Sequence, residues 1–269
     1  MLRRYSWLFV FILAFVVRLL CVIFFYKSTP YGIVVEYELG ALSLAKLVFA
    51  LLGALVPIIS YLLGRDIFSE EIGLGAGILV AVYPLFVVLS VNPSFELVEL
   101  LLFLVFLWMG VRVFLSPSFV FLVAVGVIGG LVFLYIPYMR WFPALYFVWM
   151  LFTMGSGSWK SALLYVIGFM LIFLLGGPPA EMFYWTEWWG APVCVFFAVP
   201  LFIVGMIGVV WGVVKSSKIL LLVLAMLCVV GASLWYGKVV GFSIVCAILA
   251  ILSSYTVCRA ILNVGGYGG

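Results

Sequence analysis

The sequence predicts an all-α polytopic membrane protein with about ten transmembrane helices. Of its 269 residues, 69% are hydrophobic and only 8% are charged, and the mean hydropathy is +1.45, whereas a water-soluble domain carries far more charge. Apolar windows recur along nearly the whole chain, each long enough to cross a hydrocarbon core of roughly 30 Å. Helices satisfy their own backbone hydrogen bonds in lipid, and the alternating pattern of a β-barrel is absent.

The first expected span runs from about Trp7 to Tyr26 and carries Arg18 in its second half. An arginine at this depth either extends to the outer interface or turns into the helix bundle to pair with an acid, and both interpretations stay open. Arg3 and Arg4 precede the span as in a signal peptide. Because the apolar run is too long and no small-residue cleavage site follows, we expect a retained helix.

A polar and acidic interruption, Lys27 to Lys46 with the sequence KSTPYGIVVEYELGALSLAK, separates the first two spans. It places Glu36 and Glu38 just outside the membrane. Carboxylates at such a depth are costly unless their charge is solvated or used, so both acids are candidates for a functional site. The second span is expected from Leu47 to Leu63, followed by a short charged loop from Gly64 to Gly73.

A third span is expected from Leu74 to Ser90, before a second polar break. Pro93 prevents a continuous helix there, and Ser94 can cap a new helix that begins near Phe95. Glu96 then lies in the first turn, where the positive end of the helix dipole favours a carboxylate. Glu96 is therefore either an electrostatic complement to the helix start or part of a functional site.

Seven further spans are separated by short polar turns, and the fifth span carries small residues that allow close helix contact. The expected ends of spans four to ten are Arg112, Ile136, Thr153, Leu175, Val214, Tyr236 and Arg259, and the small residues are Gly126, Gly129 and Gly130.

Two aromatic-rich segments follow the fifth and seventh spans. Arg140 lies between aromatic residues and two prolines, in PYMRWFP, where an arginine is either an interfacial anchor or a phosphate ligand. Residues 176–192 combine Glu181 and Glu187 with several large aromatics, including Trp185. These aromatics form either an interfacial belt or the lining of a substrate entrance.

The distribution of Lys and Arg predicts that both termini are cytoplasmic. The inner basic residues are then Arg3, Arg4, Arg65, Arg112, Lys160, Lys215, Lys218 and Arg259; the outer cations are Lys27, Lys46, Arg140 and Lys238; and the outer acids are Glu36, Glu38, Glu96, Glu99, Glu181 and Glu187. The outer face thus combines carboxylates with a few cations, as expected of a site that handles an anionic group and a proton.

The residue types available narrow the chemistry. The chain has no histidine, and its five cysteines show no C-x-x-C spacing, so proton transfer would depend on carboxylates or tyrosines and no disulfide framework is expected. An ion-coupled transporter would place acids near the midplane on broken helices, rather than at one face. A transferase fits better, because a carboxylate can take a proton from an acceptor hydroxyl while cations stabilise a departing phosphate.

The order of these features resembles the GT-C superfamily of integral-membrane glycosyltransferases, particularly the branch of the polyprenyl-phosphate-mannose protein mannosyltransferases and aminoarabinose transferases. The resemblance rests on Arg18, EYELGALSLAK, ALLGALVPIISYLLGRDIFSEEIGLGAGILVAVYP, NPSFELVELLLF and GGLVFLYIPYMRWFPAL, and more weakly on YGKVVGFSIVCAILAIL. We therefore expect a GT-C-like transmembrane module over residues 1–175 and variable transmembrane helices with an aromatic outer loop over residues 176–269.

The resemblance implies an inverting transferase that takes a sugar from a polyprenyl-phosphate donor on the non-cytoplasmic face, with Glu36 or Glu38 as catalytic base. The site residues are then the acids Glu36, Glu38 and Glu96, the donor-phosphate-binding cations Arg140, Lys238 and Arg18, and the substrate-loop residues Glu181, Glu187 and Trp185. No metal is assigned, although separated carboxylates could hold Mg²⁺ or Mn²⁺.

Expected partners are a polyprenyl-phosphate sugar, membrane lipids and an acceptor protein, lipid or glycan, and no nucleic acid. Compact loops, small size and the lack of histidine suit a prokaryotic cell membrane. Two alternatives remain. The short chain and the spread Glu-Tyr-Glu pair also fit a non-catalytic relative that binds the lipid or scaffolds a complex, and a transporter is the third hypothesis.

Overall fold

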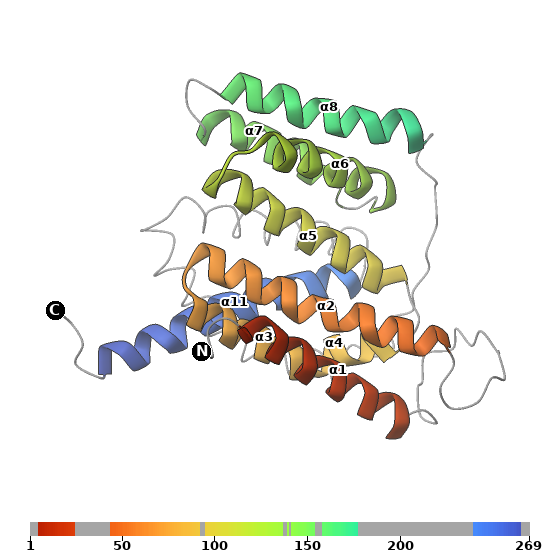
Figure 1. The fold of residues 1–269 in the computed structure, drawn as a ribbon, viewed down its shortest axis with the longest axis vertical. Coiled ribbons are helices and arrows are strands. Elements are labelled where there is room, and N and C mark those ends of the chain that lie inside the picture. Colours follow the sequence, from red (N-terminus) through yellow and green to blue (C-terminus); the bar gives the residue numbers. More distant parts are fainter. Residues whose placement is uncertain are drawn as a thin grey trace. The chain divides into compact units, whose positions relative to one another are not determined.

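The computed structural model describes residues 5–24, 44–91, 95–136, 139, 141–153, 158–176 and 239–264. Within these ranges the secondary-structure elements are all helices (Figure 1). This confirms the all-α prediction for the described residues. The elements are α1 (Ser6–Phe24), α2 (Leu44–Ile67), α3 (Glu70–Val82), α4 (Pro84–Val91), α5 (Phe95–Leu115), α6 (Phe119–Tyr135), α7 (Trp141–Thr153), α8 (Ser158–Gly176) and α11 (Val239–Val264).

Three of the described helices, α1, α2 and α5, are long and apolar enough to cross a membrane. The bent pair of α3 and α4 makes a fourth span if it is taken as one broken helix, and α6, α7, α8 and α11 contain shorter apolar helices. These lengths are those of an integral membrane protein of helical spans. The predicted total of about ten spans includes residues 177–238, which lie outside the described ranges.

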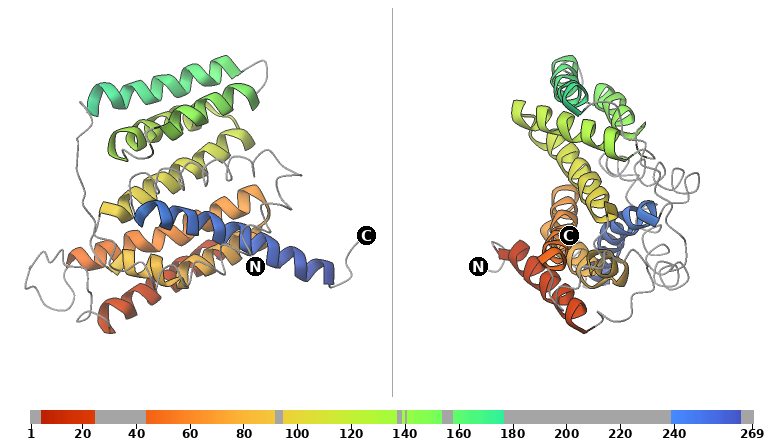
Figure 2. Two further views of the ribbon diagram at one scale, coloured as in Figure 1. Left: turned by 180° about the vertical axis from the view of Figure 1, so that it is seen from behind. Right: turned by 90° about the vertical axis from the view of Figure 1, so that its right-hand side faces the viewer.

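The chain divides into two compact units. Unit 1 comprises Met1–Val98, Glu187–Leu220 and Val245–Gly269, and unit 2 comprises Glu99–Thr186 and Leu221–Ile244. The described part of unit 1 packs α1, α2, α3 and α4 against one another, whereas α6, α7 and α8 lie side by side in unit 2 (Figures 1 and 2). Both arrangements bury helix faces between helices, as a membrane bundle requires.

The connection between α2 and α3 is shorter than the expected loop from Gly64 to Gly73. The α2 helix continues to Ile67, and α3 begins at Glu70. The start of α3 is fixed by Ser69, which caps the helix by accepting a hydrogen bond from the backbone N–H of Ile72 at 3.5 Å. The two acids in the first turn of α3 favour the same start through the helix dipole. The predicted loop boundaries were therefore wrong, and most of that segment is helical.

The expected third span is a broken helix rather than a straight one. Pro84 begins α4, and α3 and α4 are bent by 61° at the break. Pro84 has no N–H to donate to the carbonyl of Val80, and a proline disfavours the helical conformation of the residue before it. Tyr83 accordingly has extended backbone angles, with φ −68° and ψ 124°.

Unit 2 is held together by glycines and aromatic rings. A Cβ at Gly126 of α6 would overlap the carbonyl oxygen of Tyr165 in α8, and a Cβ at Gly168 of α8 would overlap the carbonyl oxygen of Val123 in α6. The two backbones therefore touch, which confirms that the small residues of the fifth expected span permit close helix contact. Beside this contact, the ring of Phe106 meets those of the α7 residues Phe142 and Tyr146 edge-on.

Candidate functional site

The structure describes two of the predicted site residues, Arg18 and Glu96. The other seven, Glu36, Glu38, Arg140, Glu181, Trp185, Glu187 and Lys238, lie outside the described residues. The roles assigned to these seven residues stay predictions.

Arg18 turns inward from α1 and is completely buried in unit 1, with 0% of its surface exposed. Its Nε donates to the Oγ of Ser90 in α4 at 2.9 Å. Its Nη1 donates to two backbone carbonyls, those of Ala14 at 3.0 Å and Ala81 at 3.3 Å. Of the two interpretations from the sequence, the inward orientation is confirmed, but the partners that these bonds identify are neutral groups rather than an acid.

The packing of unit 1 leaves room for this guanidinium at a glycine. A Cβ at Gly53 of α2 would lie 2.9 Å from the Nε of Arg18 and would overlap the side chain of Ser90. Ser90 itself donates to the carbonyl of Phe86, one turn earlier in α4. Three helices thus contribute to the surroundings of Arg18, and its position depends on a small residue in α2 and a hydroxyl in α4.

Backbone carbonyls offset the buried charge of Arg18. The last carbonyls of a helix lack intrahelical donors and carry the negative end of its dipole, so a cation placed there is stabilised. Ala81 lies in the last turn of α3, directly before the break at Pro84. Charged residues inside membranes commonly bind such carbonyls. Among the described residues, the Nη2 of Arg18 has no hydrogen-bond partner.

Glu96 is the second residue of α5, which begins at Phe95. The predicted helix start is confirmed, and Glu96 occupies the first turn, where the helix dipole favours a carboxylate. Its side chain is half-buried. The preceding helix α4 ends at Val91, so only a short segment separates the surroundings of Arg18 from the helix that carries Glu96.

At the other end of unit 1, a hydrogen bond and an aromatic stacking contact connect α1, α3, α11 and the turn between α2 and α3. Ser6 of α1 donates to the Oε1 of Glu70 in α3 at 2.9 Å, and Phe68 stacks on Tyr255 of α11 with ring centroids 4.4 Å apart. The N-terminal end of α1, the turn between α2 and α3, and the C-terminal half of α11 therefore lie at the same end of unit 1.

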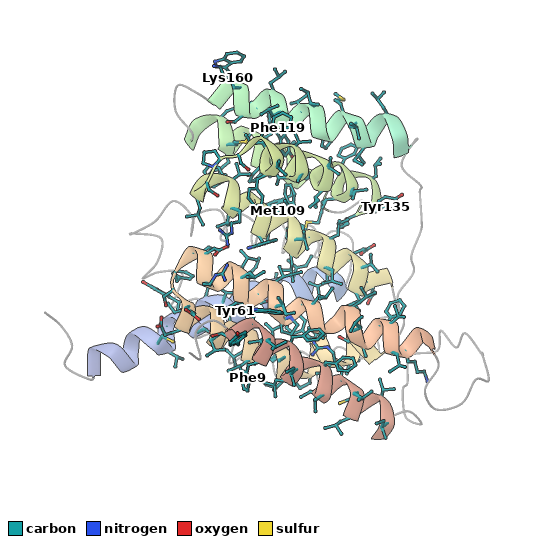
Figure 3. The ribbon with its side chains drawn as sticks, viewed as in Figure 1. Phe9, Tyr61, Met109, Phe119, Tyr135 and Lys160 are labelled. Atoms are coloured by element: carbon teal, nitrogen blue, oxygen red, sulfur yellow. The ribbon has the colours of Figure 1, made fainter. Side chains whose placement is uncertain are left out.

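The side chains of unit 1 also distinguish its interior from its outer surface. Tyr61 of α2 is buried, and its Cβ lies 3.1 Å from the position that a Cβ at Gly77 of α3 would occupy. Phe9 projects outward from α1 and is 54% exposed (Figure 3). An outward aromatic on a helix of this length is suited to contact with lipid chains.

The sequence does not reveal Ser90 and Gly53 as neighbours of Arg18. Both lie in apolar runs, and neither forms part of a recognisable motif. The available signal was indirect: a buried arginine in a span requires acceptors, and the third span offers a serine at its end. Nothing in the local pattern of α2 indicates that Gly53 faces an arginine.

Within the described ranges, no group of three His, Cys, Asp or Glu side chains could hold a metal ion. Two of the three carboxylates considered for Mg²⁺ or Mn²⁺, Glu36 and Glu38, lie outside those ranges. The assignment of a divalent cation therefore stays a prediction.

Helical membrane spans and a buried arginine stabilised by helix carbonyls define an integral membrane protein, and comparison with known families gives its class. The family model described as dolichyl-phosphate-mannose-protein mannosyltransferase matches residues 41–180, more than half of the chain. The chain belongs to this family and thus to the GT-C superfamily of membrane glycosyltransferases. The matched residues include α2 to α8, with Glu96 and Arg140. Among curated proteins, no relative matches the sequence.

Proposed function

We propose that the protein transfers a sugar from a polyprenyl-phosphate donor to a hydroxyl of an acceptor protein, lipid or glycan, on the non-cytoplasmic face of a prokaryotic cell membrane. The observation that carries this proposal is the family match over residues 41–180, on a chain whose described helices are those of an integral membrane protein. Donor and acceptor follow from the chemistry that such a family performs and from the outer cluster of acids and cations.

The proposed reaction is a direct displacement at the anomeric carbon of the donor sugar. Glu36 or Glu38 takes the proton of the acceptor hydroxyl as the new carbon–oxygen bond forms. The bond between the sugar and the phosphate breaks on the opposite face, so the configuration inverts and the polyprenyl phosphate leaves with the electron pair. Arg140 and Lys238 stabilise the charge on this leaving phosphate.

Four other residues complete the proposed site. Glu96, at the start of α5, supplies a further carboxylate in the first turn of a helix, where the helix dipole favours a negative charge. Glu181, Glu187 and Trp185 belong to the aromatic segment proposed as the substrate entrance. The prediction that Arg18 contacts the donor phosphate stays a prediction, because its Nε and Nη1 bind protein groups.

The proposed topology has about ten spans with both termini in the cytoplasm. Two contacts support it: Ser6 at the start of α1 donates to Glu70, and Phe68 stacks on Tyr255 in the C-terminal half of α11, so these parts of α1 and α11 lie at one end of unit 1. Arg65 lies at that end as well, where it forms an ion pair with Asp66 at 3.2 Å. The opposite end of α2 then leads to the acidic segment that contains Glu36 and Glu38.

Transfer from a radiolabelled polyprenyl-phosphate sugar, by purified protein in liposomes, tests this function. The Glu36→Gln/Glu38→Gln variant should lose transfer while it still inserts, because no carboxylate then remains in that segment to take the proton. Glu70→Gln/Glu71→Gln is the matched control, since it removes two adjacent carboxylates in the first turn of α3, outside the proposed site, and it should retain transfer.

Full activity of the Glu36→Gln/Glu38→Gln variant would contradict the assigned base. If the wild-type protein binds the lipid with an affinity that depends on Arg140 but transfers no sugar from several donors, the enzyme proposal fails in favour of a non-catalytic lipid-binding subunit. Flux of a substrate across sealed vesicles without transfer would instead indicate a transporter.

A further inference from the structure

We propose that Arg18 is a positioning residue: its guanidinium, bound to the carbonyl of Ala81 and the hydroxyl of Ser90, forms a clamp that holds the bend between α3 and α4. The clamp therefore sets the direction in which α4 leads to the start of α5. Its consequence for catalysis at Glu96 rests on the function proposed above, whereas the conformational part stands independently.

The backbone hydrogen bonds are interrupted at the bend. The hydrogen-bond ladder of α3 ends when Tyr83 donates to Leu79, and a new ladder begins where Phe86 and Val87 both donate to the carbonyl of Tyr83. Carbonyls at the end of α3 therefore need donors from elsewhere. Arg18 donates to one of them, the carbonyl of Ala81, at 3.3 Å, and this bond stabilises a broken span that would otherwise bury an unsatisfied acceptor.

Arg18 binds both sides of the break. Ala81 precedes Pro84 and Ser90 follows it, and a single planar guanidinium contacts both residues. Because the guanidinium is rigid, it fixes the separation of its two acceptors. Its additional bond to the carbonyl of Ala14, at 3.0 Å, anchors the group to α1. A straightened span would move Ser90 relative to Ala81 and break one of the two bonds.

The clamp lies close in sequence to the candidate site. Ser90 is the penultimate residue of α4, and α5 begins at Phe95 with Glu96 in its first turn. Arg18, Ser90 and Glu96 all belong to unit 1. Ser90→Ala should therefore alter how α4 presents the start of α5, without removing any residue of the proposed site.

The test measures the bend directly. Nitroxide labels at Glu71 and Val88, two exposed positions on α3 and α4, in a full-length cysteine-free protein, report the distance across the break by pulsed electron paramagnetic resonance. Arg18→Met and Ser90→Ala should each shift the distribution to longer distances. The double variant should shift it no further than Arg18→Met alone, because that substitution already removes the bond to Ser90.

Ser60→Ala is the matched control. Ser60 is fully buried in α2 and, like Ser90, donates to the carbonyl four residues earlier, but Arg18 donates to Ser90 rather than to Ser60. The control should leave the distance unchanged. If Arg18→Met does not fold, the comparison of Ser90→Ala with Ser60→Ala still decides the proposal.

Transfer provides a second measurement. Loss of the clamp should lower kcat about tenfold or more with little change in the KM for the donor, since misplacement of a reacting group affects the chemical step. Arg18→Lys should restore part of that loss, because an ammonium can bind some of the same acceptors. These kinetic results are meaningful only if the proposed function holds, whereas the distances do not depend on it.

An unchanged distance in both Arg18→Met and Ser90→Ala would overturn the clamp. It would also be overturned if Ser90→Ala behaved as Ser60→Ala while Arg18→Met lost affinity for the donor lipid, because Arg18 would then act as a phosphate ligand.

Discussion

Arg18 illustrates at the residue scale how a charge is kept inside a membrane bundle. A charged group in hydrocarbon is costly unless polar groups replace its hydration. Here a hydroxyl and two carbonyls provide that replacement, within 2.9 to 3.3 Å of the guanidinium nitrogens. The break in the neighbouring span makes this possible, since it frees a carbonyl at the end of α3. The break between α3 and α4 interrupts the helix, and it also provides a backbone carbonyl that binds the arginine.

Tyr165 offers a test of buried hydroxyls in unit 2. Its OH donates to the carbonyl of Pro143 at 3.0 Å, and the residue is 3% exposed. Tyr165→Phe removes the donor and leaves the carbonyl buried, which should reduce the free energy of unfolding by about 0.5 to 1.5 kcal/mol. Unfolding in detergent, followed by fluorescence as sodium dodecyl sulfate is added, measures this difference.

Tyr135→Phe is the control for this measurement, because Tyr135 is 56% exposed at the end of α6. It should change the free energy of unfolding by much less. Equal losses in the two variants would show that the bond of Tyr165 to Pro143 contributes little to stability.

At the element scale, two prolines within spans have different effects. Pro57 lies inside α2, which continues without interruption to Ile67, whereas Pro84 separates α3 from α4 with a bend of 61°. Each proline lacks the backbone N–H that another residue would donate. Membrane helices tolerate this loss where neighbouring groups bind the carbonyl that is left without a donor. At Pro84, the adjacent carbonyl of Ala81 has the guanidinium of Arg18 as its donor.

The contact between α6 and α8 gives a prediction about elements. Gly126→Ala should destabilise the protein by about 1 to 3 kcal/mol, since the added methyl group would collide with the backbone of α8 at Tyr165 and force the helices apart. Thermal unfolding in detergent measures the loss.

Val120→Leu is the control for this prediction, because it also adds a methylene group to α6 but at a position that is 71% exposed. It should be nearly neutral. If both variants unfold at the wild-type temperature, the two backbones are not in contact as described.

At the scale of the whole molecule, unit 1 relates the two ends of the chain. Ser6 contacts Glu70, and Phe68 contacts Tyr255, so the start of α1 and the C-terminal half of α11 lie on the side of the turn between α2 and α3. This is the relation required by a topology in which both termini face the same compartment. The positive-inside rule then favours the cytoplasm.

We therefore expect a green fluorescent protein fused after Gly269 to fluoresce in bacterial cells, and an alkaline phosphatase fused at the same point to be inactive.

A cysteine placed at Glu71, in an otherwise cysteine-free protein, should react with a membrane-impermeant maleimide only after the membrane is opened. Reaction of that cysteine in intact cells would reverse the proposed orientation, and an active phosphatase fusion would place the C-terminus outside.

The family match complements these observations, because it identifies the class of enzyme where the described residues alone identify a membrane protein. It covers α2 to α8 and ends at residue 180. Glu36 and Glu38 precede the matched range, so their assignment depends on the acidic loop itself and on the transfer experiment. Glu96 lies inside the range and at the confirmed start of a helix.

Several features of this protein were determined by its sequence alone. The helical membrane class follows from composition, and the helix starts at Phe95 and Phe119 follow the polar breaks that precede them. The close contact at Gly126 follows from its small residue. These features depend on interactions between residues that are close in sequence, so hydropathy, capping and residue size suffice to predict them.

Only the tertiary structure decided which residues solvate Arg18. The sequence left two orientations open and suggested an acid, whereas the side-chain partner is Ser90, 72 residues away in the chain, beside a glycine of a third helix. It likewise decided that Pro84 breaks a span and Pro57 does not. The physical reason is that a buried donor or a carbonyl without a helical donor binds whichever polar group the packing brings near. The local sequence pattern does not indicate which group that is.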